Sequence, residues 1–228
     1  MAEISKLEAP ASPNLPLAPN NYTHQHFDIF NNVLRLYFNR LAEALKGLFG
    51  ANGGRYLQNP HIAASDSTDQ YATADDTPTM VVWDTLDAGS GFTLNMTGTA
   101  TAQQGGVYKI DYSLQLVNTD TSPHDAVVWL EVTNGGVVQV PKSTRVFTLP
   151  ARKGVNNPAK VTAYSSVTFE MKTNDEVALW WATEKAYDPV GPVDGVYMEA
   201  APAQTSPYDH PAIPSAIGSI TFVSAVAT

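Results

Sequence analysis

The chain has 228 residues, of which 43% are hydrophobic and 15% are charged; its formal net charge is −9 and it contains no cysteine. This apolar content can fill a core, which excludes a chain that is disordered throughout. The missing cysteine excludes a disulfide-held domain, and the acidic balance argues against nucleic-acid binding, because phosphate backbones repel negative charge.

Residues 1–20 are predicted to form an extended arm. Pro10, Pro13, Pro16 and Pro19 recur at every third position, and this spacing favours polyproline II over a helix. Because no long apolar run is present here or further along, we expect neither a secretory leader nor a membrane span.

Residues 21–50 are predicted to form one amphipathic helix. Asn20, Asn21 and Thr23 are typical helix-capping residues, and Gly47 and Gly50 stand where the helix should stop. Apolar residues at spacings of three and four form a stripe that we expect to be an anchor or oligomer interface: Phe27, Phe30, Leu34, Tyr37, Leu41 and Leu48.

This stripe needs a partner, because a lone helix of that length is marginal in water. Three partners remain open: the β domain of the same chain, other copies of the chain, and another protein. The following residues, 51–78, are rich in Gly, Asn, Ser, Thr and Asp, and we expect them to be a connector.

From residue 79 to residue 228 the apolar pattern changes to a period of two, which indicates β-strands. The alternation is clearest in residues 109–116, 128–132 and 161–171, and Asn134-Gly135-Gly136 predicts a tight hairpin turn. Further strands are expected at 79–84, 92–101, 144–149 and 195–200. A chain that is mainly β, with at least eight antiparallel strands and no intervening helix, predicts a two-sheet jelly-roll sandwich.

The last segment places apolar residues on both of its faces, which is typical of a strand buried on two sides. In a closed homo-oligomer the second face would meet a sister subunit near the symmetry axis. We therefore predict that Ile220, Phe222 and Val226 contribute to the oligomer interface.

No catalytic motif is present: the chain has no P-loop, no G-x-S-x-G elbow, no H-E-x-x-H and no dinucleotide fingerprint. We expect no enzyme activity, no cofactor and no bound metal. Tyr187, Tyr197 and Tyr208 lie in proline-rich stretches of the kind that carry recognition in loops, so they are the candidates for surface recognition.

Several short motifs resemble structural proteins of marine and freshwater tailed phages. LPLAPNNY at residues 15–22, followed by VLRLYFNRL at 33–41, resembles their N-terminal motif. The later part resembles the TNF/C1q-like domains that these proteins carry, in the pieces GGVY at 105–108, LVNTD at 116–120, VWL at 128–130, LPAR at 149–152, WWAT at 180–183 and PAIPS at 211–215.

The resemblance implies a homotrimeric virion protein, assembled in the host cytoplasm, with a TNF/C1q-like jelly roll. A capsid-decorating (cement) or head-fibre role is expected, with the major capsid protein as partner of the arm and helix. The alternative is a receptor-binding tail fibre or adhesin that recognises a host surface glycan or protein. We expect no nucleic-acid or membrane partner.

Overall fold

The amphipathic segment near the N-terminus forms a single helix, α1 (His24–Phe49). In the computed structural model, residues 13–17, 23–49, 59–139, 142–191, 193–206 and 209–225 are described. Thr23 caps the helix, because the His26 backbone N–H donates to Thr23 Oγ1 at 3.3 Å. The helix continues through Gly47 and ends at Phe49. The sequence therefore predicted the helix and one of its capping residues.

The chain divides into two units, Met1–Gln58 and Asn59–Thr228. The second unit begins earlier than predicted, since residues 59–78, expected to be connector, supply strands β1 (His61–Asp66) and β2 (Gln70–Tyr71). β1 buries only Ile62, Ala64 and Asp66, and this pattern is too short and too poor in large apolar side chains to stand out. Its strand identity comes from its hydrogen-bonded neighbours.

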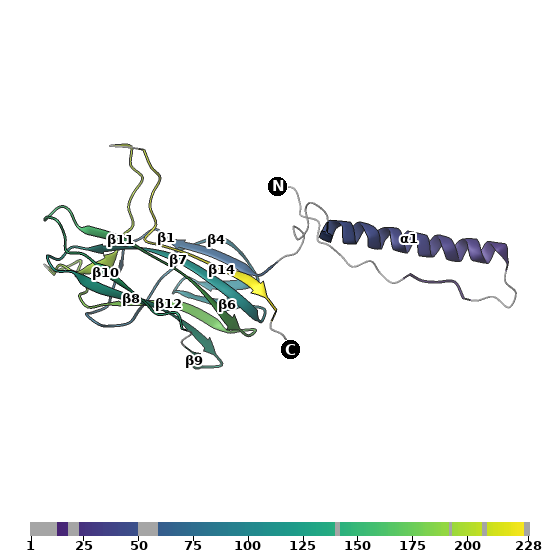
Figure 1. Ribbon diagram of the computed structural model, residues 1–228, viewed down its shortest axis with the longest axis horizontal. Coiled ribbons are helices and arrows are strands. Elements are labelled where there is room, and N and C mark those ends of the chain that lie inside the picture. Colours follow the sequence, from purple (N-terminus) through teal and green to yellow (C-terminus); the bar gives the residue numbers. More distant parts are fainter. Residues whose placement is uncertain are drawn as a thin grey trace. The chain divides into compact units, whose positions relative to one another are not determined.

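The second unit is built from two antiparallel sheets, drawn as arrows in Figure 1. Sheet A contains, besides β1 and β2, β4 (Thr85–Ser90), β7 (Gly106–Asn118), β11 (Ala159–Met171), β13 (Val196–Met198) and β14 (Ala216–Ser224). Sheet B contains β3 (Thr79–Met80), β5 (Phe92–Asn95), β6 (Thr99–Ala102), β8 (His124–Asn134), β9 (Val137–Gln139), β10 (Arg145–Leu149) and β12 (Glu176–Thr183).

The strand order confirms the predicted jelly roll. In sheet A, β7 pairs with β11 along one edge and with β14 and then β13 along the other, while β1 and β4 continue beyond β14. In sheet B the order is β10-β8-β12-β6-β5. Within the described residues, no helix is long and apolar enough to cross a membrane.

The predicted hairpin turn is present at the expected place. Gly135 and Gly136 join β8 to β9 with φ of 54° and 85°, a left-handed conformation that glycine adopts without steric cost. Asn174, with φ of 68°, lies between β11 and β12. The segment predicted as one strand over 92–101 is instead the hairpin β5–β6.

The core lies between the sheets and is filled by one face of each long strand. Its largest fully buried side chains include Trp181, Tyr108, Tyr112, Leu114 and Leu130. Adjacent tryptophans must face opposite ways in a strand, and the half-buried Trp180 lies on the other face of β12, in register with Trp129 of β8.

The final strand, β14, lies inside sheet A between β7 and β1. Its core face carries Ile220, which is 5% exposed, and Phe222 packs against the same core. Its other face carries Ile217 and Val223, which are 47% and 55% exposed in the single chain. The residues of β14 that another subunit can reach are therefore Ile217 and Val223 rather than Ile220 and Phe222; Val226 lies outside the described residues.

Gly218 on the core face of β14 makes room for the Trp83 indole. A Cβ atom built on Gly218 would lie 2.8 Å from Trp83 Cη2, closer than real Cβ contacts, and the rigid ring cannot move aside in a packed core.

We therefore expect Gly218→Ala to lower the free energy of unfolding by about 1–3 kcal/mol, because the added methyl overpacks the core. Chemical denaturation monitored by tryptophan fluorescence measures the change. Gly154→Ala is the matched control, since nothing lies within 4 Å of the Cβ position there. Equal stability of the two variants would contradict this account of Gly218.

Candidate recognition site

Several loops at one end of the sandwich are held together by a buried amide at the end of β7. The Asn118 side chain, fully buried, donates to the carbonyl oxygens of Ser122 and Pro150, each at 2.9 Å, and accepts from the Asp120 N–H at 2.8 Å. One side chain thereby fixes the turn after β7 and ties it to the segment after β10. Three hydrogen bonds compensate the cost of burying the amide.

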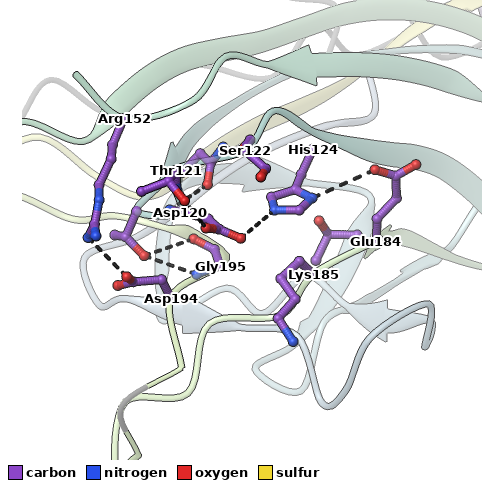
Figure 2. A network of polar contacts seen from close by, with 12 residues as sticks. Asp120, Thr121, Ser122, His124, Arg152, Glu184, Lys185, Asp194 and Gly195 are labelled. Atoms are coloured by element: carbon purple, nitrogen blue, oxygen red, sulfur yellow. Dashed lines mark hydrogen bonds and ion pairs between the residues drawn. The ribbon is translucent and has the colours of Figure 1, made fainter. Parts of the chain in front are cut away.

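His124, at the start of β8, lies between two carboxylates of this loop end (Figure 2). Its Nε2 is 2.8 Å from Asp120 Oδ2, and its Nδ1 is 3.8 Å from Glu184 Oε2. The hydrogen bond from His124 is the main reason why the pKa of Asp120 lies below its ordinary value. Glu184 also accepts from the backbone N–H of Asp125 at 3.1 Å, so His124 links the turn after β7 to the loop after β12.

A second set of contacts clamps the loop between β12 and β13 to the same turn. Arg152 forms an ion pair with Asp194 at 2.9 Å, as Figure 2 shows. The Gly195 N–H donates to Thr119 Oγ1 at 3.0 Å, and the Thr119 N–H donates to the Gly195 carbonyl at 3.0 Å. A Cβ atom at Gly195 would lie 2.5 Å from the backbone carbon of Ala186, so only glycine permits this close approach.

Three tyrosines form a stacked cluster beside this clamp. Tyr71 and Tyr197 are register partners in β2 and β13, and their ring centroids are 5.6 Å apart at an interplanar angle of 24°. Tyr187, from the loop between β12 and β13, lies 5.8 Å from Tyr71 and 4.9 Å from Tyr197. Offset arrangements at these separations are favourable for aromatic rings, so the cluster holds the loop against the sheet.

The surroundings of Tyr71 and Tyr197 raise the pKa of both hydroxyl groups. Burial, followed by the nearby Asp69 carboxylate, raises the pKa of Tyr71, whose hydroxyl donates to Asp69 at 3.1 Å. Burial, followed by the charge of Glu199, raises the pKa of Tyr197. Lys160 pairs with Glu199 at the edge of the cluster. Tyr71 and Tyr197 therefore act as hydrogen-bonding phenols rather than as charged groups.

An open cleft of about 500 Å³ lies next to the cluster, with Tyr71 and Tyr187 in its wall. Two carboxylates, Asp75 and Asp188, line it as well. Backbone hydrogen bonds from Ala186 to Asp75 and from Val190 to Asp188 are the largest causes that lower the pKa of each. Both carboxylates are therefore ionised and fixed in direction at neutral pH.

The contacts of His124 do not pair a base with a nucleophile among the described residues. Both ring nitrogens of His124 face carboxylates, so neither is directed at a hydroxyl that it could activate as a general base. The hydroxyl of Thr121 donates to Asp120. Among the described residues, no three His, Asp or Glu side chains form a group that could hold a metal ion.

The structure brings together two of the three tyrosines that the sequence suggested. Tyr187 and Tyr197 meet in the cluster, while Tyr208 lies outside the described residues. Residues 200–206 and 209–214, around that position, form two antiparallel stretches bridged at Ala201–Ile213; they are the yellow-green pair that rises from the sandwich in Figure 1.

Of the predicted helix stripe, Phe27 is 50% exposed, whereas Phe30, Leu34, Tyr37 and Leu41 are partly buried. Nothing is described of the Leu48 side chain, and the anchoring role of the stripe stays a prediction.

Sequence reasoning missed Tyr71, Asp75 and His124. Tyr71 and Asp75 fell in the segment taken for a connector, where nothing marked Tyr71 as a strand residue. His124 has no second histidine near it in the sequence. A tyrosine inside a stretch of small polar residues is the one signal that could have identified Tyr71, because a large aromatic residue is costly to leave in an exposed linker.

No known protein family matches the chain, and no curated protein matches it. The chain is similar to solved structures. One is the Eiger TNF of S. frugiperda, which matches at 14% identity and a TM-score of 0.45, over 74% of this chain and 94% of that chain. Murine APRIL matches in its pH 5.0 crystal structure at 14% identity and a TM-score of 0.44, and in its pH 8.5 structure at 15% and 0.42. Both span 72% of this chain and all of theirs. These similarities concern the jelly-roll fold, and no function is drawn from them.

Replacing Asn118 by leucine should destabilise the loop end, because it removes the buried partner of two carbonyl oxygens and one N–H. We expect a loss of about 1–3 kcal/mol in the free energy of unfolding, measured by chemical denaturation. Asn156→Leu, in an exposed turn, is the control and should change stability little. If Asn118→Leu were equally well tolerated, the buried amide would not be the support of the loops.

The lowered pKa of Asp120 predicts a pH dependence. Ionised Asp120 stabilises the fold above its ordinary pKa of 3.8, and this contribution is lost as pH falls through the lower folded-state value. The difference in Tm between wild type and Asp120→Asn should therefore be present in full above about pH 5 and should narrow as pH falls below 3.8. Thermal melts across this range measure it, with Asp87→Asn in β4 as control; a difference that widens in acid would refute the assignment.

Proposed function

We propose that this chain is a non-enzymatic structural protein of a tailed-phage virion. In this proposal α1 and the arm anchor a homotrimer to the particle, and the jelly roll is displayed outward as a capsid-decorating or head-fibre domain. The observation that carries it is that a self-contained sandwich follows a helix whose large apolar side chains are exposed: Phe27, Ile29, Leu36, Phe38 and Leu45, at 41–58%.

Exposed apolar side chains of this size favour a partner. Burying them stabilises an assembly by about 25 cal/mol per Å² of apolar surface. Three anchors acting together would also make attachment long-lived, because the second and third bind at a high effective concentration. The major capsid protein is the partner that the resemblance of the arm and helix to phage structural proteins suggests.

The outer face of sheet A is the surface that we assign to the homotrimer. Its neighbouring strands align Tyr164, Ser113, Ile217 and Ser65 in one row across the sheet. Tyr164 is 60% exposed and Ile217 is 47% exposed. In this row the small Ser113 lies between the large Tyr164 and Ile217. The uneven surface that results can pack against the same face of a sister subunit around a closed symmetry axis.

Receptor binding is the second candidate function, and the tyrosine cluster favours it. In that case the chain would be a tail fibre or adhesin whose loop end contacts a host surface glycan or protein. Imaging of the intact particle separates the two. Many copies on the shell, in contact with the major capsid protein, support decoration; a few copies at the tail only would reject it in favour of the fibre.

For the homotrimer we expect Ile217→Glu to convert the protein into monomers, because three charges would be buried close to the symmetry axis. Sedimentation velocity measures the oligomeric state, and a cooperative thermal melt of the monomer, at a lower Tm than that of the trimer, shows that the subunit still folds. Val155→Glu, at an 82% exposed turn, is the control and should remain trimeric. A wild-type protein that sediments as a stable monomer would refute the proposal.

A further inference from the structure

We infer that the cleft lined by Tyr71 and Tyr187 binds a neutral saccharide. This deepens the receptor-binding candidate above and rests on it, since it specifies the chemical class of the host ligand. The inference follows from the form of the aromatic wall, from the hydrogen-bonding groups of the cleft, and from its charge.

The cleft has the size and the wall that a short oligosaccharide requires. Its volume of about 500 Å³ lies within the range of ligand sites. Tyr71 and Tyr187 lie in its wall and stack on each other with an interplanar angle of 27°, while Tyr197 supports both from β13. Such a wall offers an apolar surface with polar edges, which suits a sugar ring with one apolar face and a rim of hydroxyls.

The polar groups of the cleft complement hydroxyls. Asp75 and Asp188 are ionised acceptors held in place by backbone N–H groups of the same loop, and each retains lone pairs for further donors. The Tyr187 hydroxyl has no hydrogen-bond partner among the described residues, so it is available both to donate and to accept. A sugar hydroxyl, which also does both, satisfies these groups together.

The charge of the cleft argues against an anionic ligand. Its lining contains two carboxylates and no basic residue, and the nearby Lys185 is already paired with Asp75 at 3.3 Å. A sialylated or phosphorylated ligand would therefore meet repulsion without compensation.

A cationic ligand fits the geometry less well than a sugar. A cation is attracted to the open face of a ring within about 6 Å, and cages built for cations surround it with several such faces. Here Tyr71, Tyr187 and Tyr197 pack against one another at centroid separations of 4.9 to 5.8 Å. The three rings therefore do not surround a common space, as the rings of a cage for a cation do.

The cleft is also organised before a ligand arrives. The Tyr187 N–H donates to the Val196 carbonyl at 3.2 Å, and the Asp188 N–H donates to the Val193 carbonyl at 3.1 Å. The loop therefore carries its two ligand-facing side chains on a backbone that is already hydrogen-bonded, which reduces the entropy cost of binding.

The test is a printed array of neutral, sialylated and cationic glycans, probed with the full chain, followed by calorimetric titration of the strongest neutral glycan. We expect binding to neutral glycans alone, with an affinity that depends little on salt, because no ion pair is formed. Tyr187→Ala should weaken binding by about tenfold or more, and Tyr187→Phe much less, because the aromatic wall is retained.

Val155→Ala is the control, since it shortens an exposed side chain in the turn between β10 and β11, outside both the cleft and the proposed trimer surface, and should bind as the wild type does. Three outcomes overturn the inference: no neutral glycan bound, binding confined to sialylated or cationic glycans, or equal affinity in Tyr187→Ala and wild type. Thermal melts of every variant show that it is folded.

Sedimentation of the same samples separates this inference from the virion proposal. A protein that sediments as a trimer but binds no neutral glycan overturns the saccharide site alone. A monomer that binds a neutral glycan through Tyr187 overturns the homotrimer and leaves the site standing.

Discussion

The fold depends on the pairing of β7 along both of its edges. Over thirteen residues this strand is hydrogen-bonded to β11 on one side and to β14 and then β13 on the other. Every second side chain enters the core, where Tyr108, Tyr112 and Leu114 are fully buried. Because a strand shifted by one residue would exchange its two faces, this pairing fixes both the core and the outer surface of sheet A.

The same strand carries the support of the loop end. Asn118, its last residue, pairs at once with β11 and β13 through the backbone and directs its amide into the turns beyond. The position of the tyrosine cluster follows from it, because β13 brings Tyr197 beside Tyr71 only while β13 lies along the end of β7. The strand pairing of sheet A thus positions the candidate site, and hydrogen bonds from the end of β7 fix the loops that carry it.

The outer face of β14 and the surface of α1 both expose apolar side chains, and they differ in the size and spacing of those side chains. On the outer face of β14, Ser219 and Thr221 separate Ile217 from Val223, so that face is neither a core nor an ordinary solvated surface. On α1 the apolar side chains are larger and nearer together. The proposal of an anchored homotrimer joins these two observations, since each surface is more apolar than an isolated subunit needs.

The sequence by itself determined the elements whose pattern is long and regular. Helix α1, strands β7, β8 and β11, the Gly135-Gly136 turn and the antiparallel sandwich followed from periodicity, because side chains on one face of a long element repeat at a fixed interval. Of the candidate site, it identified Tyr187 and Tyr197 as aromatic residues in proline-rich loops. It did not indicate that they touch.

Only the tertiary structure decided what depends on contacts between distant segments. β1 and β2 are strands because β14 and β13 pair with them, and their own short, polar sequences carry no such signal. The assignment of Ile220 to the core and Ile217 to the outer surface depends on register, which a segment apolar on both faces does not reveal. Tyr71, Asp75 and His124 belong to the site because chain segments more than fifty residues apart come into contact near the end of β7. Local sequence patterns do not predict contacts between segments that are so far apart.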